Sequence, residues 1–173
     1  TEDPAPNPYQ PVPDERKRAI RIYNDAVKQY EKATKEKVDE DKAEAIQMLR
    51  ESASLDPTFA EPHRLLARLA LKSQNYGEAA RWAEDLLRID PNDTEAIRVL
   101  YLGMVVTRNH YRVGDAARRL ATADPGAIES IEEHARTFYT NGVYVMSRAL
   151  YEVLADVSDD RLTATLNLGI CCV

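Results

Sequence analysis

The chain has 173 residues, of which 44% are hydrophobic and 30% are charged, a composition that suits a well-packed protein. Its formal net charge of -6 at pH 7 provides no basic field for a phosphate backbone, which argues against a nucleic-acid partner. The longest nearly continuous apolar run, residues 99–106, is far shorter than the roughly 20 residues of a membrane-spanning helix, so we expect no direct membrane insertion.

The N-terminal segment, residues 1–13, is rich in proline: Pro4, Pro6, Pro8, Pro11 and Pro13. Proline removes backbone donors and favours extended polyproline geometry, so we predict a linker here. A spacer to something upstream is the favoured interpretation, and a ligand for a proline-binding module is the alternative. Because the chain begins at Thr1 rather than Met, we expect that an upstream portion, such as an anchor or a signal, has been removed. The sequence does not indicate a cellular compartment.

From Asp14 onward, apolar residues recur at helical spacing, and Asp14 and Glu15 suit the positive start of a helix. The charged stretch 34–42 either lengthens this first helix or forms a longer loop before the next periodic segment, 43–55. Three antiparallel helix pairs follow: 60–73 with 76–89, 94–107 with 111–122, and 128–140 with 144–156. Gly142 marks the turn inside the last pair, where a glycine is expected.

An Asp-Pro dipeptide recurs every 34 residues, at 56–57, 90–91 and 124–125. Because proline disfavours helix in the residue before it, each dipeptide predicts a helix end. Two series run in phase with this period: Ala45, Ala79, Val113 and Ser147, and Ala67, Tyr101, Ala135 and Gly169. Tyr101 is the bulky exception, for which nearby Gly103 could provide space. Such a period predicts supersecondary units that stack on their neighbours.

The residues at these spacings resemble the tetratricopeptide repeat family, whose unit is a 34-residue helix-turn-helix. The resemblance is carried by Leu66, Ala67, Tyr76, Ala79, Ala83 and Pro91 in one unit, and by Ala135, Phe138, Gly142, Tyr144, Ser147, Tyr151 and Leu154 in another. It implies an all-α fold, a right-handed α-solenoid of antiparallel helix pairs. We expect a linker at 1–13 and an array at 14–173, with units near 15–59 (with an insertion), 60–93, 94–127 and 128–161 and a partial unit at 162–173.

Residue types that carry catalysis or bind metals are not arranged for either role. His63, His110 and His134 fall in different predicted units, and none has a second histidine or a cysteine at metal-ligand spacing. His134 has the core-facing phase of Leu66 and Leu100, so a packed, hydrogen-bonded side chain is favoured over a ligand or a base. We therefore expect no enzyme activity and no cofactor.

The C-terminal end carries the only two cysteines, Cys171 and Cys172, which as neighbours are poorly placed for an ordinary disulfide. Two small apolar residues packed on a helix is the favoured interpretation, and a vicinal thiol pair for a soft metal or redox chemistry is the alternative. Leu166, Leu168 and Ile170 do not look like a polar terminal cap. We expect truncation, a longer array, or cover by another subunit.

The resemblance implies that the first helix of each unit lines a concave groove. Projecting that phase predicts these partner-binding residues: Arg64, Arg68, Leu71, Lys72, Arg98, Leu102, Val105, Val106, Glu129, Glu132, Arg136 and Tyr139. The surface would run from basic through apolar to acidic, which suits a peptide or helix with an acidic end and an apolar middle. Solvated helix faces, or a covering helix over the apolar residues, are the alternatives.

We therefore predict a non-enzymatic protein-protein interaction scaffold that binds a peptide or helix of a partner protein. One alternative is a self-associating assembly module that uses residues 162–173. Another is a docking or regulatory region of a larger protein, which could be membrane-anchored. Some family members bind the carboxylate tail of heat-shock chaperones, but Glu129 and Glu133 stand where that site would need cations, so this partner is disfavoured.

Overall fold

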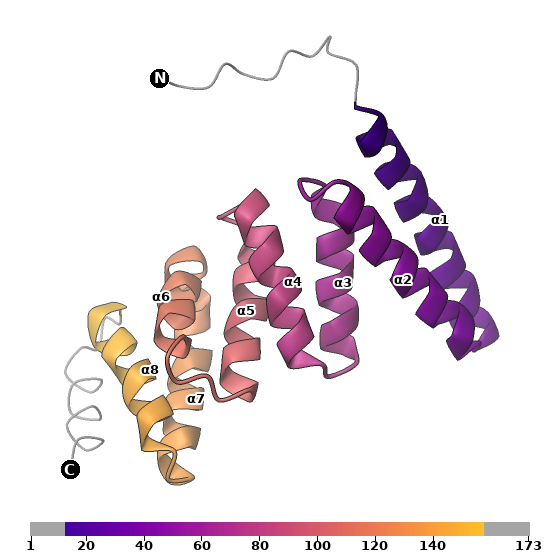
Figure 1. The fold of residues 1–173 in the computed structure, drawn as a ribbon. Coiled ribbons are helices and arrows are strands. Elements are labelled where there is room, and N and C mark those ends of the chain that lie inside the picture. Colours follow the sequence, from indigo (N-terminus) through magenta and orange to yellow (C-terminus); the bar gives the residue numbers. More distant parts are fainter. Residues whose placement is uncertain (1–12, 158–173) are drawn as a thin grey trace, which may run out of the picture. The chain divides into compact units, whose positions relative to one another are not determined.

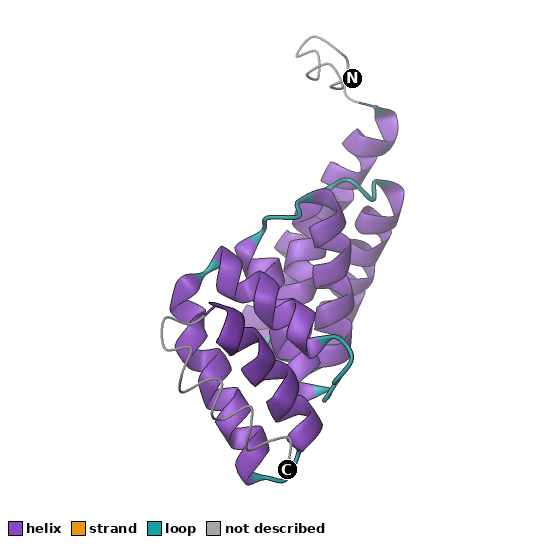
Figure 2. Cartoon of the chain, turned by 90° about the vertical axis from the view of Figure 1, so that its left-hand side faces the viewer, coloured by secondary structure: helices purple, strands orange, loops and turns teal. Residues whose placement is uncertain are grey.

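The computed structural model describes residues 13–157, and the regular elements in that range are helices (Figure 2). They are α1 (Asp14–Glu36), α2 (Asp39–Leu55), α3 (Ala60–Lys72), α4 (Tyr76–Ile89), α5 (Thr94–Val106), α6 (Val113–Ala123), the 3-10 turn η1 (Pro125–Ala127), α7 (Ile128–Thr140) and α8 (Tyr144–Val157). The predicted all-α class with antiparallel helix pairs is confirmed (Figure 1). Prolines 4 to 11, the predicted partial unit 162–173 and both cysteines lie outside the described residues.

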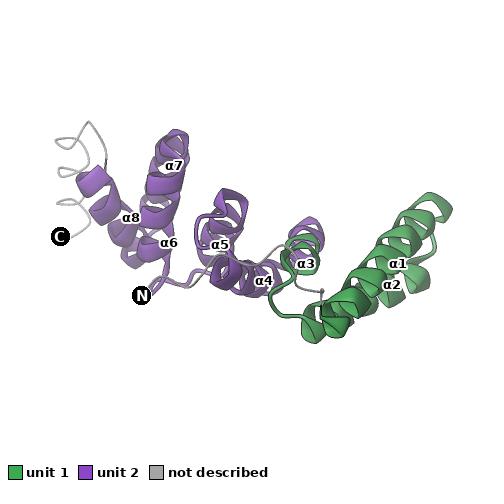
Figure 3. Cartoon of the chain, turned by 90° about the horizontal axis from the view of Figure 1, so that it is seen from above, with its two compact units in different colours: residues 1–65 green, residues 66–173 purple. Residues whose placement is uncertain are grey.

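The chain divides into two compact units, Thr1–Leu65 and Leu66–Val173, and the boundary falls within α3 (Figure 3). The bounds of α3 to α8 differ from the predicted segments by no more than two residues. The charged stretch 34–42 is mostly helical, because α1 continues to Glu36 and α2 already begins at Asp39. Lys37 joins them in the left-handed conformation, with φ 59°, and its N–H donates to the Ala33 carbonyl.

In unit 1, α1 and α2 lie side by side as an antiparallel pair (Figure 1). Ala19, Ala26 and Ala33 recur every seven residues on α1 and are fully buried, so small side chains let the two helices approach closely. Ser52 of α2 is also buried, and its hydroxyl donates to the Ala19 carbonyl at 2.8 Å. This bond satisfies a polar group that burial would otherwise leave without a partner.

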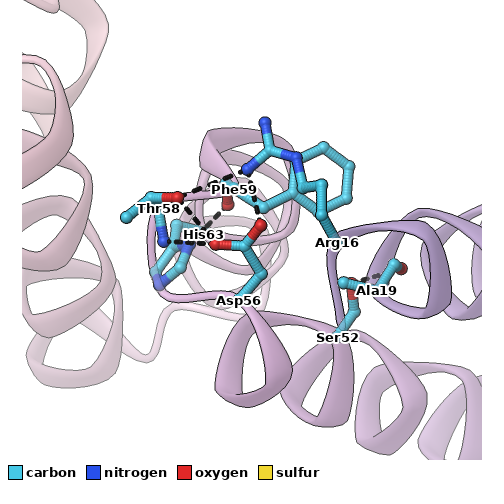
Figure 4. A network of polar contacts seen from close by, with 7 residues as sticks. All are labelled: Arg16, Ala19, Ser52, Asp56, Thr58, Phe59 and His63. Atoms are coloured by element: carbon cyan, nitrogen blue, oxygen red, sulfur yellow. Dashed lines mark hydrogen bonds and ion pairs between the residues drawn. The ribbon is translucent and has the colours of Figure 1, made fainter. Parts of the chain in front are cut away.

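A network of polar contacts connects the start of α1 with the turn before α3 (Figure 4). Arg16 donates to Asp56 at 2.8 Å and lies 4.6 Å from the centre of the Phe59 ring. Burial opposes ionisation of Asp56, but hydrogen bonds from Thr58 and Arg16 hold the pKa of that carboxyl below its usual range. The buried His63 donates from Nδ1 to the Phe59 carbonyl at 2.9 Å. These groups satisfy one another, which is how a structural network behaves.

The Asp-Pro dipeptides end three helices in the same way. Asp56, Asp90 and Asp124 have φ of -136°, -129° and -144°, the extended conformation that a following proline favours. Each carboxylate also accepts the backbone N–H two residues further on, at 2.9 to 3.1 Å, from Thr58, Asn92 and Gly126. Aspartate therefore recurs because its short side chain closes the turn that proline initiates.

A second turn, between the two helices of a repeat, also returns every 34 residues. Gln74, Arg108 and Gly142 have φ of 58°, 53° and 73°. Glycine adopts this left-handed conformation at no steric cost, whereas other L-residues lose about 1–2 kcal/mol. Gln74 and Arg108 are therefore held in this conformation by the helices on either side.

In unit 2, α5 packs against α4 and α6, and α8 packs against α6 and α7. Gly103 marks a close approach, because a Cβ there would lie 2.6 Å from Ala80 Cβ and 3.0 Å from the Tyr76 carbonyl oxygen. The absence of a side chain at Gly103 therefore allows α4 to pack closely against α5. The bulky Tyr101 is only 1% exposed, and its hydroxyl contacts His134 of α7.

Candidate functional site

The predicted partner-binding residues lie on α3, α5 and α7. On α3, Arg64 belongs to unit 1, whereas Arg68, Leu71 and Lys72 belong to unit 2. On α5, Val105 is buried, Leu102 is half-buried, and Arg98 and Val106 are exposed. On α7, Glu132 and Tyr139 are half-buried, and Glu129 and Arg136 are exposed.

Three of the predicted arginines are held in ion pairs. Arg68 binds Glu95 in a fork, with Nε 2.5 Å from Oε1 and Nη2 2.6 Å from Oε2. Arg98 pairs with Asp124, and Arg136 pairs with Glu132 at 2.7 Å on its own helix. Exposed pairs of this kind contribute at most about 1 kcal/mol to stability. They do reduce the positive charge that these arginines offer to a partner.

A pocket of about 300 Å³ lies between the end of α5 and the second half of α7. Its lining residues are Val105, Val106, Arg108, His134, Thr137, Phe138, Asn141 and Val143. Of the predicted residues, Val105 and Val106 therefore reach this pocket. On α7 the lining residues His134, Thr137 and Phe138 follow the spacing of one helix face, which Asn141 continues just after the helix ends. The predicted Glu129, Glu132, Arg136 and Tyr139 do not line the pocket.

Tyr101 of α5 holds His134 in place. The Tyr101 hydroxyl lies 2.9 Å from His134 Nδ1, and Tyr101 is almost fully buried while His134 is half-buried. Burial raises the pKa of Tyr101 well above its usual range, so the hydroxyl keeps its proton. Burial lowers the pKa of His134, although the negative charge of Glu133 partly opposes this. The imidazole is therefore neutral at pH 7, and the predicted packed, hydrogen-bonded histidine is confirmed.

Tyr101 and His134 both depart from the repeat pattern, and the structure shows that they depart together. Tyr101 stands in a series of small residues, and His134 stands where other repeats have leucine. Their ring centres are 5.6 Å apart. With leucine at position 134 the buried hydroxyl would lose this partner, which costs about 1–3 kcal/mol. The hydrogen bond between them thus accounts for both departures from the repeat pattern.

Sequence reasoning did not assign Arg108, Thr137, Phe138, Asn141 or Val143 to a binding site. Arg108, Asn141 and Val143 belong to turns, whereas the prediction considered only helix faces. Phe138 was one of the residues that carried the repeat pattern, so it was interpreted as a packing position, and Thr137 falls outside the helix phase that was projected onto the groove. A signal was nevertheless present, because Tyr101 and His134 fall on the same 34-residue grid as apolar residues of the other repeats.

A second pocket, of about 460 Å³, lies between the turn before α5 and the surface of α6. It is a weaker candidate because its two arginines are already engaged. Arg118 pairs with Asp156 at 2.8 Å, and Arg119 donates to the Pro91 carbonyl at 3.4 Å. Within residues 13–157 no group of three or more His, Cys, Asp or Glu side chains could hold a metal ion. No helix in that range is long and apolar enough to cross a membrane.

Comparison with known proteins agrees with this fold. The chain is similar to the crystal structure of MamA protein, with a TM-score of 0.58 and 13% identity over 87% of this chain and 80% of that one. It is also similar to MamA 41-end from Desulfovibrio magneticus RS-1, with a TM-score of 0.53 and 13% identity over 94% of this chain and 96% of that one. At this identity the likeness concerns the fold alone. No curated protein sequence matches the chain.

Residues 39–100 match the sequence model of the tetratricopeptide repeat family. Repeats of this family generally mediate protein-protein interaction and are generally non-catalytic. The Asp-Pro period and the helix pairs of the structure extend the same organisation beyond the matched residues. Residues 39–100 are therefore identified as a tetratricopeptide-repeat segment.

Proposed function

We propose that this chain is a non-enzymatic interaction module that holds a segment of a partner protein by an apolar side chain in the pocket between α5 and α7. The observation that carries this proposal is Val106, whose surface is 49% exposed although it lines a pocket with Val105, Phe138 and Val143. Covering apolar surface contributes about 25 cal/mol for each Å² removed from water. An apolar side chain of a partner bound in the pocket would obtain this free energy by covering Val106.

The remaining predicted residues of unit 2 are proposed to contact flanking parts of the same segment. Leu102 and Arg98 continue along α5 from the pocket, while Leu71 and Lys72 occupy the last turn of α3. The predicted residues of α7 would meet the segment on another face of that helix. Since Arg98 is already paired with Asp124, we expect this outer contact to add specificity more than affinity.

A random peptide library displayed on phage tests the proposal. We expect the selected peptides to share an apolar residue and to bind the Val106→Asp variant at least tenfold more weakly, which corresponds to about 1.4 kcal/mol. The control is Val145→Asp, since Val145 is a 62% exposed valine on α8 and does not line the pocket. Circular dichroism checks that both variants are folded.

Two outcomes would count against the proposal. Equal binding by wild type and Val106→Asp would place recognition elsewhere on the molecule. Failure to select peptides with a shared apolar residue would reject the module itself. A third case is that a second copy of the chain occupies the pocket. Sedimentation equilibrium of the unliganded protein tests for it, because the measured mass would then depend on protein concentration and on Val106.

A further inference from the structure

We infer that the pocket selects a segment in which an acidic side chain stands next to the apolar one, and that Arg108 and His134 donate to its carboxylate. This inference rests on the proposed function and names the chemistry of the partner. It concerns two side chains that the sequence did not assign to binding, one on the turn after α5 and one on α7.

The charge of the pocket differs from that of the whole molecule. The chain carries a formal net charge of -6, yet the lining residues include the cation Arg108 and no carboxylate. Arg108 is exposed, and the ion pairs described above for Arg68, Arg98 and Arg136 do not involve it. Glu133, one turn before Thr137 on α7, is a nearby acid outside the lining. An acidic group on the partner therefore complements the pocket.

The backbone around Arg108 is anchored. Its N–H donates to the Val105 carbonyl at 3.2 Å, and the next N–H, that of Asn109, donates to the Met104 carbonyl at 2.9 Å. The left-handed conformation of Arg108 is the one that Gly142 adopts at the equivalent position of the next repeat. Gln74 adopts it too, so the conformation belongs to the turn, and what distinguishes position 108 is an exposed cationic side chain that lines the pocket.

His134 supplies the second donor because Tyr101 fixes its tautomer. Tyr101 is almost fully buried, its hydroxyl pairs with His134 Nδ1, and a buried hydroxyl is best satisfied when it donates its proton to that nitrogen. The hydroxyl proton therefore points at Nδ1, and the neutral ring carries its own proton on Nε2. The two ring nitrogens point in different directions, so the Nε2–H of this pocket-lining residue is directed away from Tyr101. Thr137 and Asn141 add further polar atoms to the same wall.

Nuclear magnetic resonance titration with four synthetic peptides tests this inference. Each decapeptide is built of glycine and serine around a central pair, which is Leu-Glu, Leu-Gln, Leu-Lys or Ala-Gln. We expect Leu-Glu to bind at least fivefold more tightly than Leu-Gln, and Leu-Lys to bind most weakly. Arg108→Gln should abolish the preference for Leu-Glu, while Arg81→Gln, an equal change of charge at an exposed site on α4, should keep it.

The ring nitrogens of His134 provide a readout that needs no substitution. Their chemical shifts should report a proton on Nε2 in the free protein, and the Nε2 signal should move with Leu-Glu but not with Leu-Gln. Equal affinity for Leu-Glu and Leu-Gln, with both above Ala-Gln, would overturn the carboxylate inference and leave the proposed function standing. Equal affinity for all four peptides would reject both.

Discussion

The close approach of α4 and α5 at Gly103 makes a quantitative prediction. A Cβ at this position would lie 2.6 Å from Ala80 Cβ, whereas carbon atoms in contact prefer about 3.5–4.0 Å, so the helices would have to separate by about 1 Å. Overpacking of this kind costs about 1–3 kcal/mol. Alanine in the helix regains about 1 kcal/mol over glycine, so Gly103→Ala should destabilise unit 2 by up to about 2 kcal/mol.

Gly77 provides the matched control. It lies on α4, where an added Cβ would meet nothing within 4 Å, so Gly77→Ala should stabilise by up to about 1 kcal/mol. Urea unfolding followed by circular dichroism at 222 nm measures both variants, and both report on the α4–α5 pair. The difference between them isolates the overpacking cost, which we expect to be about 1–3 kcal/mol. Equal midpoints for the two variants would refute the close packing deduced at Gly103.

Three further predictions concern stability. Ala79→Leu, at a fully buried position, should cost about 1–3 kcal/mol, and an unchanged urea midpoint would reject the assigned register. Gly142→Ala should cost about 1–2 kcal/mol because φ there is 73°, and a thermal midpoint equal to that of wild type would contradict this. Burial lowers the pKa of His134 from 6.5, so the folded state binds fewer protons than the unfolded state below that pH, and stability should fall from pH 7.5 to 5.5. Urea midpoints should show that His134→Gln removes this histidine's share of the slope, whereas the same slope in His134→Gln as in the control His110→Gln would exclude that contribution.

The helices could be predicted because their signals are local. Helical periodicity and the proline after Asp56, Asp90 and Asp124 act within a few residues, so the bounds of α3 to α8 follow closely from the sequence. The pocket could not be predicted in this way. Its walls come from the turn at Arg108 and from a face of α7, and they meet only after the helices pack.

The charge of the candidate surface could not be predicted either, because it depends on contacts between helices. Arg68 looked like a free cation because its partner, Glu95, lies on another helix, and no spacing rule within one helix connects them. The contact between Tyr101 and His134 could be predicted only in part. Each residue was visible as an exception to the repeat, but only the structure showed that the hydroxyl of one is satisfied by the ring of the other.

Packing between helices that follow one another in the chain has a consequence for folding. The contacts of α1 with α2, of α4 with α5, of α5 with α6 and of α7 with α8 close only short loops, so little chain entropy is lost before each contact forms. The pair of α1 and α2 can therefore assemble on the ribosome before α8 has been synthesised. Unfolding should likewise proceed from one helix pair to the next, because in such an array each pair depends on its immediate neighbours.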